Sequence, residues 1–297
     1  MLNIANMKTK ILISAANGVV MRSLIGELRK NFYVVGIDNN SQGDAKKYCD
    51  EFFNSPNGNN NKFFSFLKKM EKKVDFIFLY VDEELRTINK QKIPTKLQNK
   101  LILSDKNTLN TCLNKKKFYE FCSKNKINFP SNSYSKKMIA KPIFGRGSMN
   151  IYMLKNKFEY NFFKRNKNYI VQKFIEGKEY TIDCLFDSNG KLIFGLPRLR
   201  IVHKGVSIIG KIVKDSKIIT FVTLISKKLK FYGPINIQVI KDKNNKVWIL
   251  EINPRLSGSI EFSIKAGFNP LIYFSKGKRK FNSIKYNKIY KRSFELN

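Results

Sequence analysis

The chain has few of the residues on which many enzymes build their chemistry. Its 297 residues include one histidine, His203, and four cysteines, none of them in a Cys-x-x-Cys arrangement. A single histidine excludes a two-histidine metal site, and the cysteine spacing argues against both a zinc site and a disulfide framework. Unpaired thiols of this kind are typical of a reducing compartment, so we expect a cytoplasmic protein.

Long apolar runs and acidic residues are also scarce. No apolar stretch approaches the roughly 20 residues of a transmembrane helix, so we expect no membrane partner. The 57 Lys and Arg residues outnumber the 22 Asp and Glu residues, which gives a formal net charge of +35. Such a charge favours contact with nucleic acids. Because the lysines are spread through every segment and no nucleic-acid-binding motif is present, we expect weak nonspecific binding and no specific nucleic-acid partner.

The first hundred residues alternate apolar strands with helical spacing. Strands are expected at 10–15, 32–37, 74–81 and 101–103, with a helix at 19–30. This order predicts a Rossmann-like α/β domain over residues 8–104, whose parallel strands end at a common crevice. The polar residues and turn glycine expected at that crevice are Gly18, Asp38, Asp82 and Glu84.

The remaining chain is typical of an antiparallel α+β fold. A helix expected over 105–125 is followed by strands and hairpins, with turns at 187–190 and 242–245. We expect a second domain over 105–275, divided into subdomains at about 105–172 and about 173–275. The lysine-rich residues 276–297 are expected to form a peripheral basic tail.

A polar pair ends one of the last expected strands, in the segment Val-Trp-Ile-Leu-Glu-Ile-Asn-Pro-Arg. Side chains alternate along a strand, so Glu251 and Asn253 should point the same way. Two hard oxygen ligands followed by Arg255 suit a magnesium ion that carries nucleotide phosphates. A strand end that reaches solvent would carry the same residues, and the pair alone leaves both readings open. Gln238, on the preceding strand, would add a third oxygen ligand.

Two other segments have the residues of a nucleotide site. Gly145-Arg146-Gly147-Ser148 lies between two expected strands, just after Lys141. Its glycines would let backbone N–H groups approach a polyphosphate, although a hairpin turn needs glycine as well. Residues 169–183 form two expected strands joined through a glycine. Their connection could present backbone groups to an adenine edge and Glu179 to ribose hydroxyls, or it could be an ordinary β-connection.

Taken in order, these motifs resemble those of an ATP-grasp ligase. The series is Lys115, Lys141-Pro-x-x-Gly-x-Gly-Ser148, Gln172-x-x-Ile-x-Gly-x-Glu179, Gln238 and Glu251-x-Asn-Pro-Arg255. The resemblance is strongest to the short proteins that are similar to half of the carbamoyl-phosphate synthase large subunit. It covers about residues 8–274 and implies a pre-ATP-grasp Rossmann-like domain, followed by an ATP-grasp fold made of a lid and a C-terminal subdomain. The chain departs from the family in having Asn114 before Lys115, where aspartate is usual.

The resemblance implies a role for each motif. ATP would be bound by Lys115, Lys141, Gly145, Arg146, Gly147, Ser148, Gln172, Lys173, Phe174, Ile175 and Glu179. Magnesium, or manganese in its place, would be held by Gln238, Glu251 and Asn253. A carboxylate substrate, or the acyl phosphate formed from it, would be held by Arg255, Arg198 and Arg200. His203 follows these arginines and is expected to be a surface residue.

The activity that the resemblance implies is an ATP- and Mg²⁺-dependent carboxylate–amine ligase. Such an enzyme phosphorylates a carboxylate to an acyl phosphate, from which a nitrogen nucleophile displaces phosphate. One alternative is activation of bicarbonate through carboxyphosphate, and another is a degenerate ATP-grasp scaffold that binds nucleic acid. The sequence does not name the substrates, so we expect small-molecule carboxylates and amines as partners and leave a homodimer open.

Overall fold

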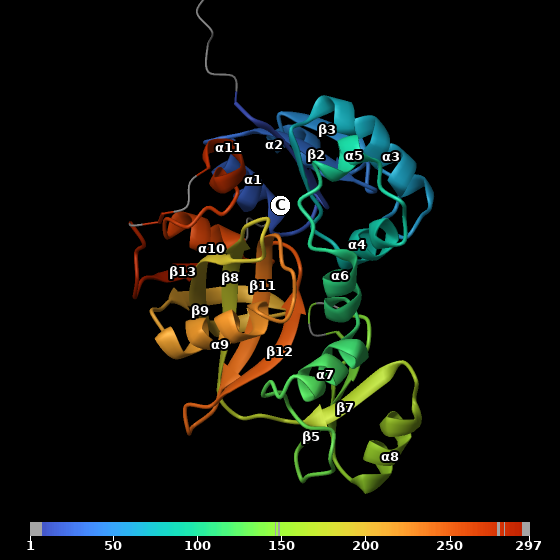
Figure 1. The fold of residues 1–297 in the computed structure, drawn as a ribbon, viewed down its shortest axis with the longest axis vertical. Helices are drawn as coiled ribbons and strands as arrows, with labels where there is room; N and C mark the ends of the chain where they lie inside the picture. Colours follow the sequence, from blue (N-terminus) through green and yellow to red (C-terminus); the bar gives the residue numbers. More distant parts are fainter. Residues whose placement is uncertain (1–7, 146, 148, 278–279, 282, 293–297) are drawn as a thin grey trace, which may run out of the picture.

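The computed structural model describes residues 8–145, 147, 149–277, 280–281 and 283–292. The strands in these residues form three sheets, which Figure 1 shows in separate parts of the molecule. A four-stranded sheet comes from the N-terminal third, a three-stranded sheet from the middle, and a six-stranded sheet from the C-terminal half. Helices α6 (Lys106–Cys112) and α7 (Lys115–Lys124) run from the first sheet to the smallest one.

The first sheet is parallel, which confirms the predicted α/β architecture. Its order is β3 (Glu51–Asn54), β2 (Tyr33–Asp38), β1 (Lys10–Ser14) and β4 (Phe76–Phe78). The helices and the 3-10 turn that accompany it are α1 (Met21–Arg29), α2 (Ala45–Tyr48), α3 (Lys62–Met70), η1 (Glu71–Lys73), α4 (Asp82–Asn89) and α5 (Thr95–Gln98). Strand β3 was not predicted, and the strand expected at 101–103 makes only a single bridge, from Leu101 to Ile77.

The packing of β1 explains why the strands of this sheet are continuously apolar in sequence and do not alternate with polar residues. Ile11 and Ile13 pack in one hydrophobic cluster with α1, whereas Leu12 packs in a second cluster with α3 and α4. Both faces of the sheet are therefore covered, as in other parallel sheets.

The middle of the chain contains two helices where the sequence predicts one over 105–125. The helix breaks at Asn114, whose extended backbone and side-chain oxygen cap α7 by accepting from the Lys117 N–H at 3.1 Å. The three-stranded antiparallel sheet follows, in the order β6 (Tyr152–Leu154), β5 (Met138–Pro142), β7 (Tyr169–Lys173), with α8 (Lys157–Arg165) packed on it.

The six-stranded sheet is antiparallel throughout, as predicted for this half of the chain. Its order is β12 (Val247–Asn253), β11 (Gly233–Lys241), β8 (Lys178–Phe186), β9 (Leu192–Lys204), β10 (Val206–Ile212) and β13 (Ile289–Lys291). Helix α9 (Ser216–Ser226) follows β10, and α10 (Ile260–Lys265) and α11 (Ile272–Lys276) follow β12.

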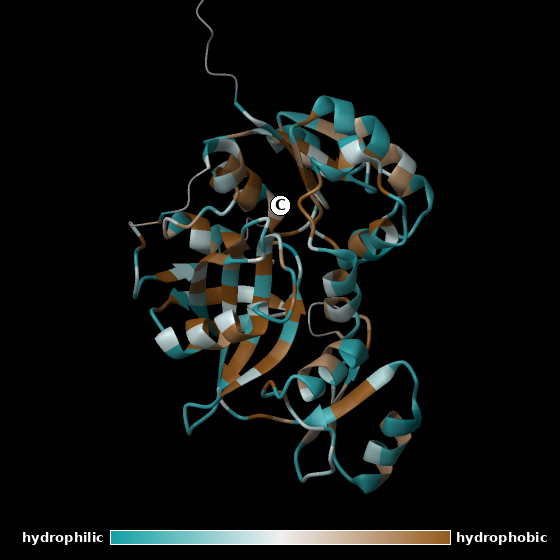
Figure 2. Cartoon of the chain, viewed as in Figure 1, coloured by the Kyte–Doolittle hydropathy of each residue, from teal (hydrophilic) through white to brown (hydrophobic). Residues whose placement is uncertain are grey.

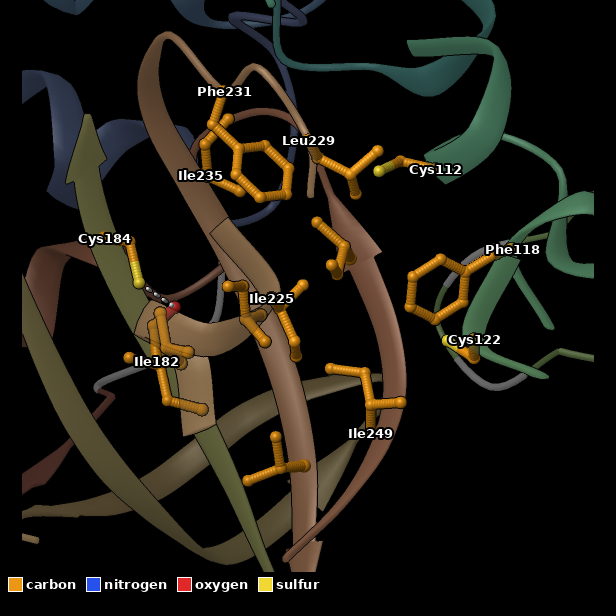
Figure 3. Close-up of a cluster of buried hydrophobic side chains, with 14 of the residues drawn as sticks. Cys112, Phe118, Cys122, Ile182, Cys184, Ile225, Leu229, Phe231, Ile235 and Ile249 are labelled. Atoms are coloured by element: carbon orange, nitrogen blue, oxygen red, sulfur yellow. Dashed lines mark hydrogen bonds between the residues drawn. The ribbon is translucent and has the colours of Figure 1, made fainter. Parts of the chain in front are cut away.

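The two faces of this sheet differ in chemistry, as the alternating colours along its strands in Figure 2 show. One face packs on α9 and α7 in the main hydrophobic cluster, where Ile182, Ile225 and Phe231 are fully buried (Figure 3). The side chains that alternate with these apolar residues include Glu179, Thr181 and Asp183 of β8. The polar face of the sheet is thus left for the functional site.

The prediction of a peripheral basic tail is wrong for Phe281 and for residues 289–292. Ile289–Lys291 forms the edge strand β13 beside β10, and Phe281 is buried against Phe268. Arg292 is also buried, in an ion pair with Glu261 at 2.9 Å. The prediction rested on the lysine-rich composition of this segment and overlooked its few apolar residues, which make this packing. The domain limits expected at 104, 172 and 275 stay predictions.

Candidate functional site

A cavity of about 250 Å³ lies between the three-stranded sheet and the polar face of the six-stranded sheet. The structure brings to it these predicted site residues: Lys115, Lys141, Gly145, Gly147, Gln172, Phe174, Ile175, Glu179, Arg200, Gln238 and Glu251. Its apolar lining includes Ile139, Met149, Ile151, Met153, Ile240 and Leu250. Larger hollows, of about 1030 Å³, lie beside α9 and beside the connection at 176–178, but neither contains the predicted metal ligands.

A β-bulge in β12 aims the Glu-x-Asn pair at this side of the sheet. Gln238 is the register partner of Glu251, and the next residue of β11 is paired with Ile249, so Leu250 is the extra residue. The bulge shifts the alternation by one position. Ile249 therefore faces the hydrophobic core, while Glu251 and Asn253 turn to the polar face.

The predicted metal ligands form one connected group. The Asn253 Nδ2 donates to Glu251 Oε1 at 3.1 Å, and Gln238 lies opposite Glu251 on the paired strand. Asn253 does not itself line the cavity. One carboxylate with two amide oxygens suits Mg²⁺, which prefers hard oxygen ligands and keeps positions for water and phosphate. Among the described residues, no group of three or more His, Cys, Asp and Glu side chains could hold a metal, so a metal bound here would also need the amide oxygens.

Two lysines face these oxygens across the cavity. The Lys115 Nζ donates to the Gly145 carbonyl at 3.0 Å and lies 3.9 Å from Glu251 Oε2. Lys141 is only 6% exposed, and its Nζ donates to the Tyr119 hydroxyl at 2.7 Å. Burial lowers the pKa of Lys141 from its ordinary value of 10.5 to about 8, although Glu251 acts to raise it. No carboxylate among the described residues lies within 4 Å of this ammonium group.

The sequence reasoning missed Tyr119. It follows Lys115 by four residues, so both side chains lie on one face of α7, and this spacing was a usable signal. The Tyr119 hydroxyl donates to the carbonyl of the bulge residue Leu250 at 2.7 Å, and its ring stacks on Phe129. One hydroxyl thus contacts both Lys141 and the bulge that orients Glu251.

Glu179, expected to hold ribose hydroxyls, is contacted by an arginine and a histidine. Arg200 donates to its Oε1, and the His203 Nε2 lies 3.4 Å from its Oε2. Arg200 also donates to Gln238 Oε1 at 3.4 Å and to the Gly205 carbonyl at 3.1 Å. His203 is exposed, as predicted, and burial of its ring, followed by the charge of Arg200, lowers its pKa.

The glycine loop approaches the β9–β10 turn. Gly147 and Gly205 have φ values of +65° and +73°, and a Cβ at Gly205 would lie 2.8 Å from the Gly147 carbonyl oxygen. Both positions therefore favour glycine. Arg146 and Ser148, which were predicted to contact phosphates, lie outside the described residues.

The predicted adenine-reading segment reaches the cavity only in part. Phe174 and Ile175 line it, but Lys173 is exposed and does not. The N–H groups of Lys173 and Phe174 already donate to the carbonyls of Ser131 and Lys137, at 2.8 and 2.9 Å. The buried Gln172 Oε1 faces the cavity without a hydrogen-bond partner among the described residues, so a ligand could use it.

The structure places Arg198 away from the cavity, contrary to its predicted contact with substrate. Its side chain is completely buried. It donates to Ser207 Oγ at 3.0 Å and to Asp183 Oδ2 at 3.3 Å, and it lies over the Phe262 ring. Arg198 and Arg200 share a strand face, but residues from β10 and α10 enclose the former. We therefore leave Arg198 out of the proposed substrate contacts.

Arg255 joins the end of β12 to the crevice of the first sheet. Its Nε donates to Asp82 Oδ1 at 2.7 Å, and its side chain is 12% exposed. Burial acts to raise the pKa of Asp82, but Arg255 outweighs it and the pKa lies below its ordinary value. Beside this pair, burial raises the pKa of Glu84 to about 7, and Ser14 donates to its carboxyl group. The crevice expected from the sequence thus adjoins Arg255.

Comparisons with known proteins point to the same fold. Residues 165–289 match the model of a family described as ATP-grasp in the biosynthetic pathway with Ter operon. The structure is similar to N5-carboxyaminoimidazole synthetase from Staphylococcus aureus complexed with ADP, with a TM-score of 0.68 and 15% identity over 88% of this chain and 74% of that chain. The chain has the ATP-grasp fold. This is the fold that the ordered motifs imply.

Two further solved structures resemble it equally well. An L-amino acid ligase from Bacillus licheniformis has a TM-score of 0.69 and 14% identity, covering 92% of this chain and 75% of that chain. The biotin carboxylase domain dimer of Hydrogenobacter thermophilus 2-oxoglutarate carboxylase, in complex with MgADP and bicarbonate, has a TM-score of 0.68 and 15% identity, covering 95% and 73% of the two chains.

The carbamoyl phosphate synthase large chain of Clostridium acetobutylicum is related in sequence. It is 30% identical over 113 residues, which is 35% of this chain and 10% of that protein. The matched region is thus a small part of that relative's length. In the described residues, no helix has the length and apolar character needed to cross a membrane.

Proposed function

We propose that this ATP-grasp protein is a carboxylate–amine ligase that uses ATP and Mg²⁺ and acts through an acyl phosphate. The observation that carries the proposal is the convergence of Glu251, Gln238 and two lysines on one cavity. These side chains come from β12, β11, α7 and β5, and an ordinary strand end would not collect them. The set combines oxygen ligands for a metal with cations for phosphates.

Each part of the cavity has a role in this proposal. The apolar residues around Phe174 and Ile175 would receive adenine, and Lys115, Lys141 and the glycine loop would receive the phosphates. Gln238, Glu251 and Asn253 would hold Mg²⁺, which when bound neutralises charge on the phosphate oxygens. Manganese is a second candidate ion.

The reaction needs positioning rather than a protein nucleophile. A carboxylate oxygen of the substrate attacks the γ-phosphorus of ATP, and the bond from that phosphorus to the β–γ bridging oxygen breaks, which releases ADP. The amine nitrogen then attacks the acyl carbon, loses a proton and displaces inorganic phosphate. Arg255 and Arg200 are the proposed contacts for the carboxylate and the developing acyl phosphate.

The crevice beside Arg255 is the proposed entry for the substrates. Ser14 ends β1 there, and Asp82 and Glu84 lie in the first turn of α4, which follows β4. Ligands of α/β sheets usually bind at this edge, beyond the ends of the parallel strands. The partners are small-molecule carboxylates and amines. The proposal also includes a homodimer. It further includes a cytoplasmic location, which is in keeping with the four free, buried cysteines.

The test is a screen of carboxylates and amines for ADP release by the purified protein. Glu251→Ala and Asn253→Ala should abolish ADP release, because each removes a metal ligand, while circular dichroism shows an intact fold. Glu120→Ala, an exposed carboxylate on α7, is the matched control and should keep full activity. Full activity in either ligand variant would reject the metal assignment. ADP release with bicarbonate and no other carboxylate would favour the carboxyphosphate alternative.

A further inference from the structure

We propose that Tyr119 is a positioning residue for nucleotide phosphates, and that it acts by holding the Lys141 ammonium group in place. This inference rests on the proposed function, because it concerns the same ATP cavity. It adds a residue that belongs to none of the recognised motifs.

The hydroxyl of Tyr119 joins three elements around the cavity. It accepts a hydrogen bond from the Lys141 Nζ of β5 at 2.7 Å and donates one to the Leu250 carbonyl of β12 at 2.7 Å. The tyrosine itself stands on α7, one turn after Lys115. Donating to a fixed carbonyl orients the hydroxyl so that a lone pair faces the ammonium group.

The Tyr119 ring is held rigidly, so the hydroxyl has little freedom to move. The side chain is 9% exposed, and its ring stacks on Phe129 with centroids 5.4 Å apart and an interplanar angle of 18°. Phenylalanine would fill the same space. The hydroxyl is therefore the part of this side chain that packing alone does not require.

Without that hydroxyl, Lys141 would be drawn toward carboxylates. It has no acidic partner within 4 Å among the described residues, and Glu251 and Glu179 are the negative charges that act on it. A buried cation without a hydrogen-bond acceptor costs free energy, so an opposite charge nearby attracts it more strongly. Lys141 would then compete with Mg²⁺ for Glu251 and leave the position from which it meets a phosphate.

The experiment compares ADP and adenosine binding to wild type and Tyr119→Phe by calorimetry, with and without Mg²⁺. ADP affinity should fall about tenfold, the usual effect of losing one hydrogen bond to a charged group. Adenosine, which has no phosphate, should bind both proteins equally. Tyr160→Phe is the matched control, because it removes a tyrosine hydroxyl that bonds a backbone carbonyl, Asn132, outside the cavity.

A double-mutant cycle tests whether Tyr119 acts through Lys141. In a Lys141→Met background, Tyr119→Phe should change ADP affinity less than twofold. Unchanged ADP affinity in Tyr119→Phe alone, equal losses for ADP and adenosine, or a full effect in the Lys141→Met background would each overturn the inference while leaving the proposed function standing. A wild-type protein that binds neither ADP nor ATP would reject both.

Discussion

At the residue scale, Lys141 shows how the site trades stability for binding. Its ammonium group is buried at the cavity wall with a phenol as its hydrogen-bond acceptor and no close carboxylate in the described part of the chain. Such a group destabilises the folded protein until an anion arrives. A phosphate would supply that anion, and on the proposed function this would make the cavity selective for phosphorylated ligands.

Lys141→Met should therefore make the ligand-free protein more stable at pH 7. Because the folded-state pKa, about 8, lies below the ordinary 10.5, the unfolded chain holds more protons between these pH values. Wild-type stability thus rises with pH through that window. The variant should gain roughly 3 kcal/mol below pH 8 and lose this gain in stability towards pH 10.5. Denaturant unfolding at several pH values measures it, and a variant less stable at pH 7 would contradict the burial argument.

At this scale, the position of the Glu251 side chain could be predicted from the sequence, whereas the burial of Arg198 could not. Alternation along a strand correctly placed Glu251 and Asn253 on one side, because that rule depends only on local geometry. The same rule puts the Arg198 and Arg200 side chains on one face of β9, which suggested a shared role. It cannot tell that Asp183, Ser207 and α10 close over Arg198, since that burial depends on residues far apart in the chain.

At the element scale, the β9–β10 turn supports the glycine loop. Gly205 has left-handed backbone geometry, and its α-carbon faces the backbone of Gly147. The sequence identified the loop from its glycines. It could not identify Gly205, because the approach joins segments more than fifty residues apart in the printed sequence.

Gly205→Ala should weaken nucleotide binding severalfold. The added Cβ would stand 2.8 Å from the Gly147 carbonyl and would push the loop away from the phosphates. The control is Gly190→Ala, which has a similar φ of +78° but no neighbour closer than 3.6 Å. Both should lose about 1 kcal/mol of stability from the left-handed backbone, and only the first should change ADP affinity. Equal ADP affinities in the two variants would show that the loop does not depend on this contact.

The buried ion pair that follows the C-terminal strand should stabilise the fold strongly. Arg292→Ala leaves the Glu261 carboxylate buried without its partner, a change that usually costs about 3–5 kcal/mol. Arg29→Ala, which breaks an exposed pair with Asp50, should cost no more than about 1 kcal/mol. Urea midpoints measure both. Similar midpoints would mean that the Arg292–Glu261 pair contributes little, as expected of a peripheral tail.

At the scale of the whole molecule, the site depends on all three sheets. The Arg255–Asp82 pair ties the first sheet to the end of β12, and residues from the other two sheets line the proposed ATP cavity. The sequence predicted the order of these parts and their fold class, since strand periodicity and motif order are local properties. It did not predict the contacts across them, such as Tyr119 with Leu250.

The net charge of +35 should give nonspecific binding without function in catalysis. Binding to duplex DNA should fall by about 10³ between roughly 50 and 200 mM salt, because it arises from counterion release. Unrelated DNA sequences should bind alike, and saturating DNA should leave ADP affinity unchanged. Filter binding at graded salt measures this. Salt-resistant or sequence-selective binding would favour the degenerate nucleic-acid-binding alternative.

The most direct test of carboxylate activation follows an oxygen atom. The carboxylate that triggers ADP release is labelled with ¹⁸O on both oxygens, and the inorganic phosphate formed with Mg·ATP and amine is analysed by mass spectrometry. Attack of the carboxylate on the γ-phosphorus predicts phosphate that carries one ¹⁸O atom, alongside ADP. Unlabelled phosphate, AMP in place of ADP, or no carboxylate that triggers ADP release would contradict an acyl-phosphate ligase.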